Sequence, residues 1–183
     1  MIAVIEVPAI RQRAMRFSVK DCHRFTEGQP TELLRGTIIE KMSKSPLHCD
    51  TVEALREILT GQIRPGFVLR QEGPLTLHDS EPEPDIAVVR GVRQDFRTAH
   101  PSIATLVIEV AGPSLEIDRV KTHIYAEAGV AEYWIVCPEE KQVEVYRGPR
   151  SYGYAEHTML AAPAALECAA LPGVRVDLAV LFA

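Results

Sequence analysis

The 183-residue chain has no apolar run as long as a membrane span, which argues against a protein built on transmembrane helices. Its first ten residues are apolar, but Glu6 and Pro8 interrupt them and no basic start or cleavage site is present, so no secretory signal is expected. Cysteine is scarce as well. The four cysteines lie far apart without a CxxC pair, which argues against structural zinc and favours reduced thiols in the cytoplasm.

The sequence also lacks an excess of basic residues. Its 20 Lys and Arg stand against 25 Asp and Glu, and the formal charge of -5 argues against a protein that coats nucleic acid through a basic face. A nuclease is not excluded, because carboxylates that hold metal ions add negative charge that the bound cations offset. The length and the 46% hydrophobic content predict one globular domain over residues 1–183 with a substantial core.

The stretch from Thr105 to Trp134 predicts a strand, a turn, a helix and the start of a second strand. Its TLVIEV run carries one charge, Glu109, and such runs are typical of strands buried on both faces of a mixed or parallel sheet. Gly112-Pro113-Ser114 ends the strand, and Ser114 can cap a helix that runs to about Ala128. A carboxylate in such a strand needs a partner, a metal or water, so a salt bridge and a functional role are equally open.

The helical periodicity places Lys121 on the inner face of this helix. The predicted apolar stripe consists of Ile117, Val120, Ile124 and Ala128. Lys121 falls inside that stripe, Asp118 lies one turn earlier at its edge, and Ala126 is assigned to the solvent side. Such a lysine can extend along the helix to water. Its place near Glu109 favours a functional role instead, with Asp118 keeping the ammonium charged and oriented.

Three upstream residues are further candidates. In EPEPDIAVV the prolines hold an extended backbone, so Asp85 stands where a stiff segment enters a buried strand; this suits a metal ligand and also an ordinary exposed acid. Glu40 shares an otherwise apolar face of a hairpin predicted at TELLRGTIIEKMS, although exposure at a sheet edge is the favoured explanation. His48 lies near the start of a predicted helix, where spacing alone favours a surface or capping role.

The remaining pattern completes the expected architecture. Helices are predicted over residues 18–28 and 43–63, and EYWIVC with QVEVYR forms a hairpin after the central helix. Three arginines, Arg90, Arg93 and Arg97, form a modest basic cluster expected near the site, with solvation their commoner role. The apolar tail LAVLFA is expected to dock on the core or on a second subunit.

Two carboxylates at strand ends and one nearby lysine suit metal-assisted cleavage of a phosphodiester. Magnesium takes one or two protein carboxylates, and water and substrate phosphate complete its coordination. A bound metal lowers the pKa of its water, and an ammonium can orient that water or stabilise charge on the phosphate. The residues that fit these roles are Asp85, Glu109 and Lys121.

These motifs resemble the PD-(D/E)XK restriction-endonuclease-like superfamily. The run IEVAGPSLEIDRVKTHIYAEAGVAEYWIV, with ELLRGTIIEKMSKSPLH and EPDIAVV, is similar to its Uma-two branch of endonucleases, and the likeness covers roughly residues 18 to 170. The resemblance implies an α/β (α+β) fold, in which helices flank a mixed sheet of four or five strands beside an N-terminal β-hairpin. It also implies cleavage of nucleic acid, with DNA the expected substrate and Mg (or Mn) as cofactor.

The same resemblance assigns roles. Asp85 and Glu109 would be metal ligands, and Lys121 would be the catalytic lysine, because Ala111 occupies the superfamily's usual lysine position. Asp118 and a recurrent histidine matched by His48 would support them. Two further departures are Gly112, where the branch usually has serine, and Cys137, where it often has aspartate.

Other functions stay open. A degenerate member of the fold would bind nucleic acid or a protein partner without cleaving it. A sugar hydrolase would need a pair of carboxylates but no lysine, so Lys121 argues against it. Family habit and the apolar tail also suggest a homodimer.

Overall fold

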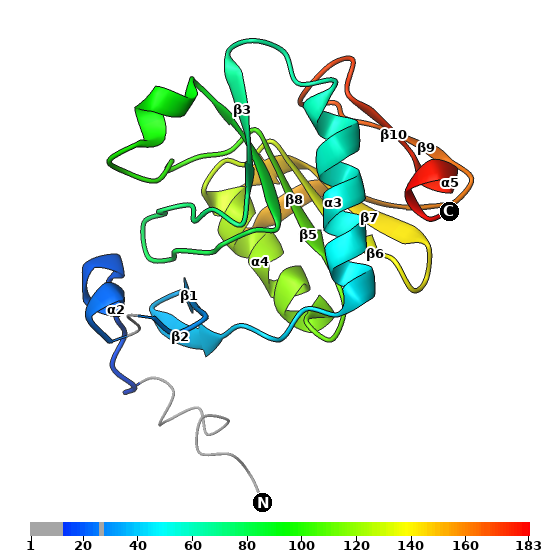
Figure 1. Ribbon diagram of the computed structural model, residues 1–183. Coiled ribbons are helices and arrows are strands. Elements are labelled where there is room, and N and C mark those ends of the chain that lie inside the picture. Colours follow the sequence, from blue (N-terminus) through cyan, green and yellow to red (C-terminus); the bar gives the residue numbers. More distant parts are fainter. Residues whose placement is uncertain (1–12, 26–27) are drawn as a thin grey trace, which may run out of the picture.

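The computed structural model describes residues 13–25 and 28–183 (Figure 1). A six-stranded mixed sheet with helices on both faces and a separate N-terminal hairpin confirms the predicted fold class, with more strands than the expected four or five. Within the described ranges, no helix combines the length and the apolar character needed to cross a membrane. The expectation that the first ten residues are no export signal concerns a segment outside the described residues.

The predicted helices and hairpins are present. The first part of the chain forms α2 (Val19–Phe25), the hairpin strands β1 (Thr31–Leu34) and β2 (Thr37–Glu40), and α3 (Pro46–Thr60). The large sheet is built from β3 (Phe67–Gln71), β4 (Ile86–Arg90), β5 (Leu106–Val110), β6 (Glu132–Cys137), β7 (Gln142–Arg150) and β8 (Gly153–Ala161). The other elements are the 3-10 turn η2 (Arg93–Phe96), α4 (Leu115–Glu127), β9 (Ala165–Glu167), β10 (Arg175–Asp177) and α5 (Leu178–Leu181).

Local sequence accounts for the hairpin of β1 and β2 and for the start of α3. The turn between β1 and β2 has Arg35 and Gly36 at φ of 52° and 74°, and two positive φ values match the twist of a tight hairpin. Ser45 caps α3 by accepting a hydrogen bond from the backbone N–H of His48 at 3.2 Å, and Pro46 occupies the first turn. The helix therefore starts at a defined point beside the hairpin.

The large sheet has the order β3-β4-β5-β6-β7-β8, and its strands are antiparallel except for the parallel pair β5 and β6. The helix α4 connects that pair and covers one face of the sheet, while α3 lies over the other face (Figure 1). Because side chains alternate along a strand, Trp134 and Val136 pack on the α3 side, whereas Tyr133 and Ile135 pack on the α4 side. The central strands β5 and β6 are thus buried on both faces, as the TLVIEV run predicts.

Strand register brings the first two candidate acids together. The strands β4 and β5 are antiparallel, and Ile86 pairs with Ile108. Asp85 comes one residue before Ile86 and Glu109 one residue after Ile108, so they fall opposite each other at the end of the ladder. Both continue the alternation that faces α4.

The predicted stripe on α4 is wrong at two positions. Val120 is 59% exposed, and Ala126, which the prediction assigns to solvent, is buried. The helix is rotated so that Lys121 and Tyr125 point toward the sheet, and the rings of Tyr125 and Tyr133 approach to 4.9 Å between centroids. The packing of Tyr125 against Tyr133 of β6 therefore determines which face of α4 is buried. The positions of apolar residues along the helix do not reveal this contact.

The arginine cluster lies away from the acids rather than beside them. Arg90 is the last residue of β4, and Asp85 is the residue directly before the first residue of that strand. At the usual rise of a strand, about 17 Å separates the two residues. Arg93 lies in η2 and Arg97 directly follows it, beyond that far end of β4. These three arginines are therefore not part of the candidate site.

The C-terminal tail docks on the protein's own core. Leu178, Leu181 and Phe182 are buried in the cluster on the α3 side of the sheet. The tail is therefore accounted for within one chain, and a homodimer stays a prediction.

Replacing Leu59 with alanine should destabilise the protein, because this side chain of α3 is fully buried in the core. We expect a loss of about 2–5 kcal/mol, the usual range for such cavities, in urea unfolding followed by the fluorescence of the buried Trp134. Val120→Ala is the control and should change stability by less than about 0.5 kcal/mol because Val120 is exposed. Equal losses would contradict the assigned helix faces.

Candidate active site

Asp85 and Glu109 form a buried carboxylate pair between β4 and β5. The backbone N–H of Asp85 donates to Glu109 Oε2 at 3.3 Å, and the N–H of Val110 donates to Asp85 Oδ2 at 2.8 Å. The hydroxyl of Tyr125 donates to the other oxygen of Glu109, Oε1, at 2.9 Å. Backbone and tyrosine contacts thus fix the direction of both acids.

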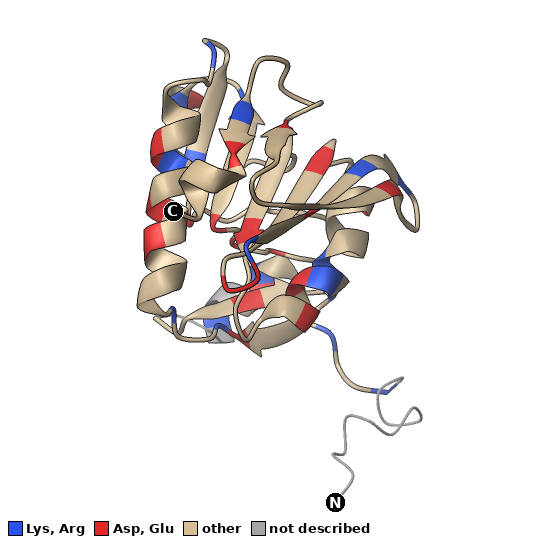
Figure 2. Ribbon diagram, turned by 90° about the vertical axis from the view of Figure 1, so that its right-hand side faces the viewer, with Lys and Arg blue, Asp and Glu red and all other residues tan. Residues whose placement is uncertain are grey.

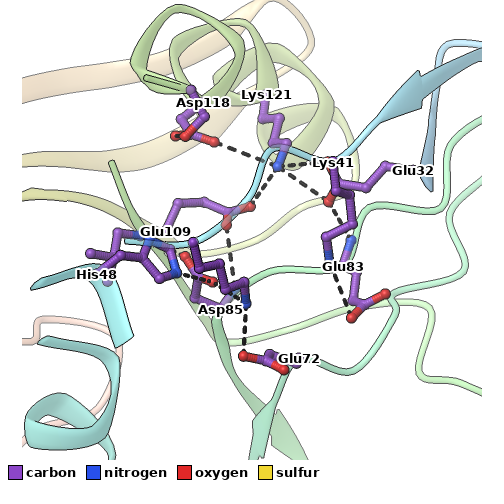
Figure 3. A network of polar contacts seen from close by, with 12 residues as sticks. Glu32, Lys41, His48, Glu72, Glu83, Asp85, Glu109, Asp118 and Lys121 are labelled. Atoms are coloured by element: carbon purple, nitrogen blue, oxygen red, sulfur yellow. Dashed lines mark hydrogen bonds and ion pairs between the residues drawn. The ribbon is translucent and has the colours of Figure 1, made fainter. Parts of the chain in front are cut away.

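Lys121 reaches this pair from α4 (Figure 3). Its side chain is buried, and Nζ lies 3.0 Å from Glu109 Oε1, 2.9 Å from Glu32 Oε2 and 3.5 Å from Asp118 Oδ1. The lysine therefore does not extend along the helix to water. It is the centre of a charge cluster that includes both residues expected beside it, Glu109 and Asp118.

Glu32, on β1, is the partner that sequence reasoning missed. It is buried and also accepts a hydrogen bond from the backbone N–H of Glu83 at 2.7 Å. A signal was available, because Glu32 is a charged residue directly before Leu33 and Leu34 in the strand TELL and pairs across the hairpin with Ile39. Glu40, the hairpin acid that was proposed, is exposed at the rim of the cleft and has no ion pair within the described ranges.

His48, in the first turn of α3, and Lys44, just before that helix, both contact Asp85. His48 Nε2 lies 3.1 Å from Asp85 Oδ1, so its ring joins the cluster although the sequence alone favoured a surface or capping role. Lys44 Nζ lies 3.2 Å from the same oxygen and 2.7 Å from Glu72 Oε1. Lys44 is a second contact that the sequence analysis did not identify, because it depends on how the segment between β2 and α3 crosses the end of the sheet.

These residues surround a cleft between the hairpin, the start of α3 and the start of α4. Its charged and histidine lining residues include Glu32, Glu40, Lys44, His48, Asp85, Glu109, Asp118 and Lys121. The structure therefore brings Asp85, Glu109, Lys121, Asp118 and His48 together, and leaves Glu40 at the edge.

The cluster carries more negative charge than its lysines balance. Burial raises the pKa of Glu109 to about 8; Lys121 opposes this shift, while Asp118, Asp85 and Glu32 add to it. Burial also raises the pKa of Asp118. For Lys121, burial acts to lower the pKa, but Glu109, Glu32 and Asp118 together raise it, so the ammonium stays charged.

Asp85 differs from its neighbour. Burial acts to raise its pKa, yet the hydrogen bond and charge of His48, the amide of Val110 and the charge of Lys44 together lower it. Asp85 is therefore the ionised member of the pair at neutral pH. Two adjacent carboxylates with opposite shifts are typical of functional sites.

The chemistry of the pair fits a divalent cation. Within the described ranges, no three His, Cys, Asp or Glu side chains gather as a preformed metal-binding set. Magnesium commonly takes only one or two carboxylates, so Asp85 and Glu109 suffice. Burial and, to a lesser extent, the neighbouring acids raise the pKa of Glu109, and a bound cation would oppose both effects.

The raised pKa of Glu109 predicts a pH-dependent cost to the fold. The folded protein keeps a proton on Glu109 up to about pH 8, whereas the unfolded chain loses it near pH 4.5. The contribution of this residue to the free energy of unfolding therefore decreases as the pH rises from about 4.5 to about 8. Glu109→Gln, which cannot ionise, should gain stability relative to wild type across that interval, by at most about 1.4 kcal/mol per pH unit. Thermal melts from about pH 5 to about pH 9 measure the difference. Glu139→Gln, at an exposed acid, is the control, and parallel profiles for Glu109→Gln and wild type would contradict the assignment.

Comparison with known proteins agrees with this architecture. A family model described as "Uma2: Putative restriction endonuclease" matches residues 19–180. The crystal structure of "a putative nuclease belonging to DUF820" from Anabaena variabilis ATCC 29413 superposes with a TM-score of 0.77 at 20% identity, covering 91% of this chain and 97% of that one, which shows the shared fold. Among curated proteins, none matches. Since the family model spans nearly the whole chain, this protein belongs to the Uma2 family, the branch that its motifs resemble.

Proposed function

We propose that this protein is a divalent-metal-dependent endonuclease that hydrolyses phosphodiester bonds of nucleic acid, with DNA as the substrate. The observation that carries the proposal is the buried Lys121 ammonium, held 3.0 Å from Glu109 beside the ionised Asp85. Membership of a family described as restriction endonucleases supports a nucleic acid as the substrate. The four free cysteines fit a reducing cytoplasm as the place where it acts.

Asp85 and Glu109 are the residues that would hold Mg or Mn. Glu109 Oε1 is engaged by Lys121 and Tyr125, and Asp85 Oδ2 by Val110, which leaves Asp85 Oδ1 and Glu109 Oε2 as the oxygens with weaker or exchangeable partners. When bound, such a metal polarises the phosphate and lowers the pKa of a coordinated water.

The chain's own residues supply the remaining functions. Glu32 and Asp118 hold the Lys121 ammonium charged and aimed at the edge of the carboxylate pair, where it can orient an attacking water or stabilise charge on phosphate oxygens. His48 contacts Asp85 Oδ1 and restrains the carboxylate from the α3 side. Glu40 lies at the rim of the cleft, where it can only influence what enters.

Charges elsewhere are mixed, so recognition of the substrate centres on the cleft. Figure 2 shows acidic and basic residues interspersed along α3 and across the strands, without a basic face in that view. Lys41 and Lys44 border the carboxylates in the cleft itself. Phosphate contacts by these lysines would position the backbone without reading its sequence.

A binding module without catalysis is the second candidate. The observation that favours it is that Lys44 and Lys121 already occupy oxygens of both carboxylates. Such a protein would bind nucleic acid, and the binding would weaken with salt, but it would not turn over.

Cleavage assays separate the two candidates. With Mn²⁺ or Mg²⁺ and a panel of single- and double-stranded DNA and RNA, we expect wild type to cleave and Asp85→Asn and Lys121→Met to lose at least about a hundredfold in rate, the scale of a lost electrostatic contact. Asp95→Asn, at an exposed acid in η2, is the matched control and should keep its activity. Full activity in Asp85→Asn and Lys121→Met would rule out this site, and salt-dependent binding without cleavage by wild type would favour the binding module.

Metal binding can be measured without turnover. Mn²⁺ should raise the melting temperature of the wild type, because a ligand that binds only the folded state stabilises it. A concentration near a hundred times the dissociation constant should contribute about 2.7 kcal/mol. Asp85→Asn should abolish the shift and Asp95→Asn should retain it; a shift that survives Asp85→Asn would place the metal elsewhere.

A further inference from the structure

Lys44 makes a contact that the proposed reaction does not use. It lies between β2 and α3, and its ammonium bridges Glu72 Oε1 at 2.7 Å and Asp85 Oδ1 at 3.2 Å. Its side chain is 27% exposed, so it is neither buried like Lys121 nor free in solvent. A lysine in this position spans the boundary between the carboxylate pair and the cleft mouth.

The two oxygens of Asp85 are not equivalent. Oδ2 accepts a backbone hydrogen bond from Val110 at 2.8 Å, which belongs to the end of the sheet. Oδ1 meets only the side chains of Lys44 and His48 in the described part of the chain. Oδ1 is therefore the oxygen through which Asp85 can take a cation, and Lys44 is the permanently charged group on it, beside the ring of His48.

The three lysines of the cleft have different partners. Lys121 is buried among Glu32, Glu109 and Asp118, so its position is set by the fold. Lys41 pairs with Glu83 at 3.1 Å. Lys44 has one anchor outside the carboxylate pair, Glu72, whose side chain is 45% exposed, and can keep that anchor while it leaves Asp85.

We propose that Lys44 is a built-in competitor for the metal, an ammonium that neutralises Asp85 until a divalent cation displaces it. This inference rests on the proposed function. The two cations repel each other at contact distance and compete for the same oxygen, so the binding of one disfavours the other. The flexible four-carbon stem lets the ammonium move aside, and Glu72 keeps it at the cleft mouth, where a substrate phosphate becomes its next partner.

The competition has a direct consequence for metal uptake. Displacing Lys44 opposes metal binding, so the wild type needs a higher metal concentration than the carboxylate pair alone would require. A substrate phosphate that draws Lys44 away from Asp85 lowers the metal concentration that is needed. Metal binding and substrate binding are thereby coupled. Lys44 is thus a positioning residue that acts through Asp85.

Mn²⁺ titration by isothermal calorimetry tests this in four full-length variants and wild type. We expect Lys44→Met to bind Mn²⁺ about tenfold more tightly, because the competing charge is gone. Lys44→Arg keeps the charge and should stay within about threefold of wild type. Lys41→Met removes a lysine of the same cleft that does not contact Asp85, so it should also stay near wild type. Asp85→Asn should bind Mn²⁺ in no measurable amount, which locates the site.

The outcomes distinguish this inference from the proposed function. Unchanged or weaker Mn²⁺ binding in Lys44→Met, with cleavage intact in wild type, overturns the role of Lys44 alone. Equal tightening in Lys41→Met also overturns it, because a general loss of positive charge would then explain the effect. Binding that persists in Asp85→Asn, or is absent from every protein, overturns both this inference and the metal assignment beneath it.

Discussion

The ammonium of Lys121 is the contact on which the arrangement of the site depends. It joins three acids from three elements: Glu32 on the hairpin, Glu109 on β5 and Asp118 on its own helix. Without that charge, three buried carboxylates would face one another, and each pair of like charges would disfavour ionisation. The lysine therefore ties the N-terminal hairpin to the sheet and fixes the wall of the cleft.

Such a cluster is a poor way to stabilise a fold. Desolvating several charges costs energy that their attraction repays only in part, and apolar side chains of similar volume are often as stable. Burial raises the pKa of Glu109, and the opposing charge of Lys121 does not offset that shift. A buried acid whose charge is not fully compensated can accept a further cation, which agrees with the proposed metal site better than with a purely stabilising role.

Periodicity and local motifs predicted the sheet, the helices and most of the cluster. The apolar run around Glu109 and the prolines before Asp85 each marked a strand end, and strand register then placed the two acids opposite each other. The predicted apolar stripe wrongly included Val120, which is exposed, but it still placed Lys121 on the buried face of the helix. Glu32 was marked by its charge in the strand TELL, but its partner Lys121 comes from a distant helix. The contact of Lys44 with Asp85 depends on the path of the segment between β2 and α3, which leaves no mark in local spacing.

The position of the lysine follows from the same geometry. Ala111 lies two residues after Glu109, so both face α4, and Ala111 is packed in the core cluster beneath that helix. A long side chain from the strand at that point would have to displace those neighbours, whereas Lys121 brings its ammonium to Glu109 from the helix side, at 3.0 Å. What the chemistry needs is a cation beside the second carboxylate. Either element can supply it, and here the packing against α4 favours the helix.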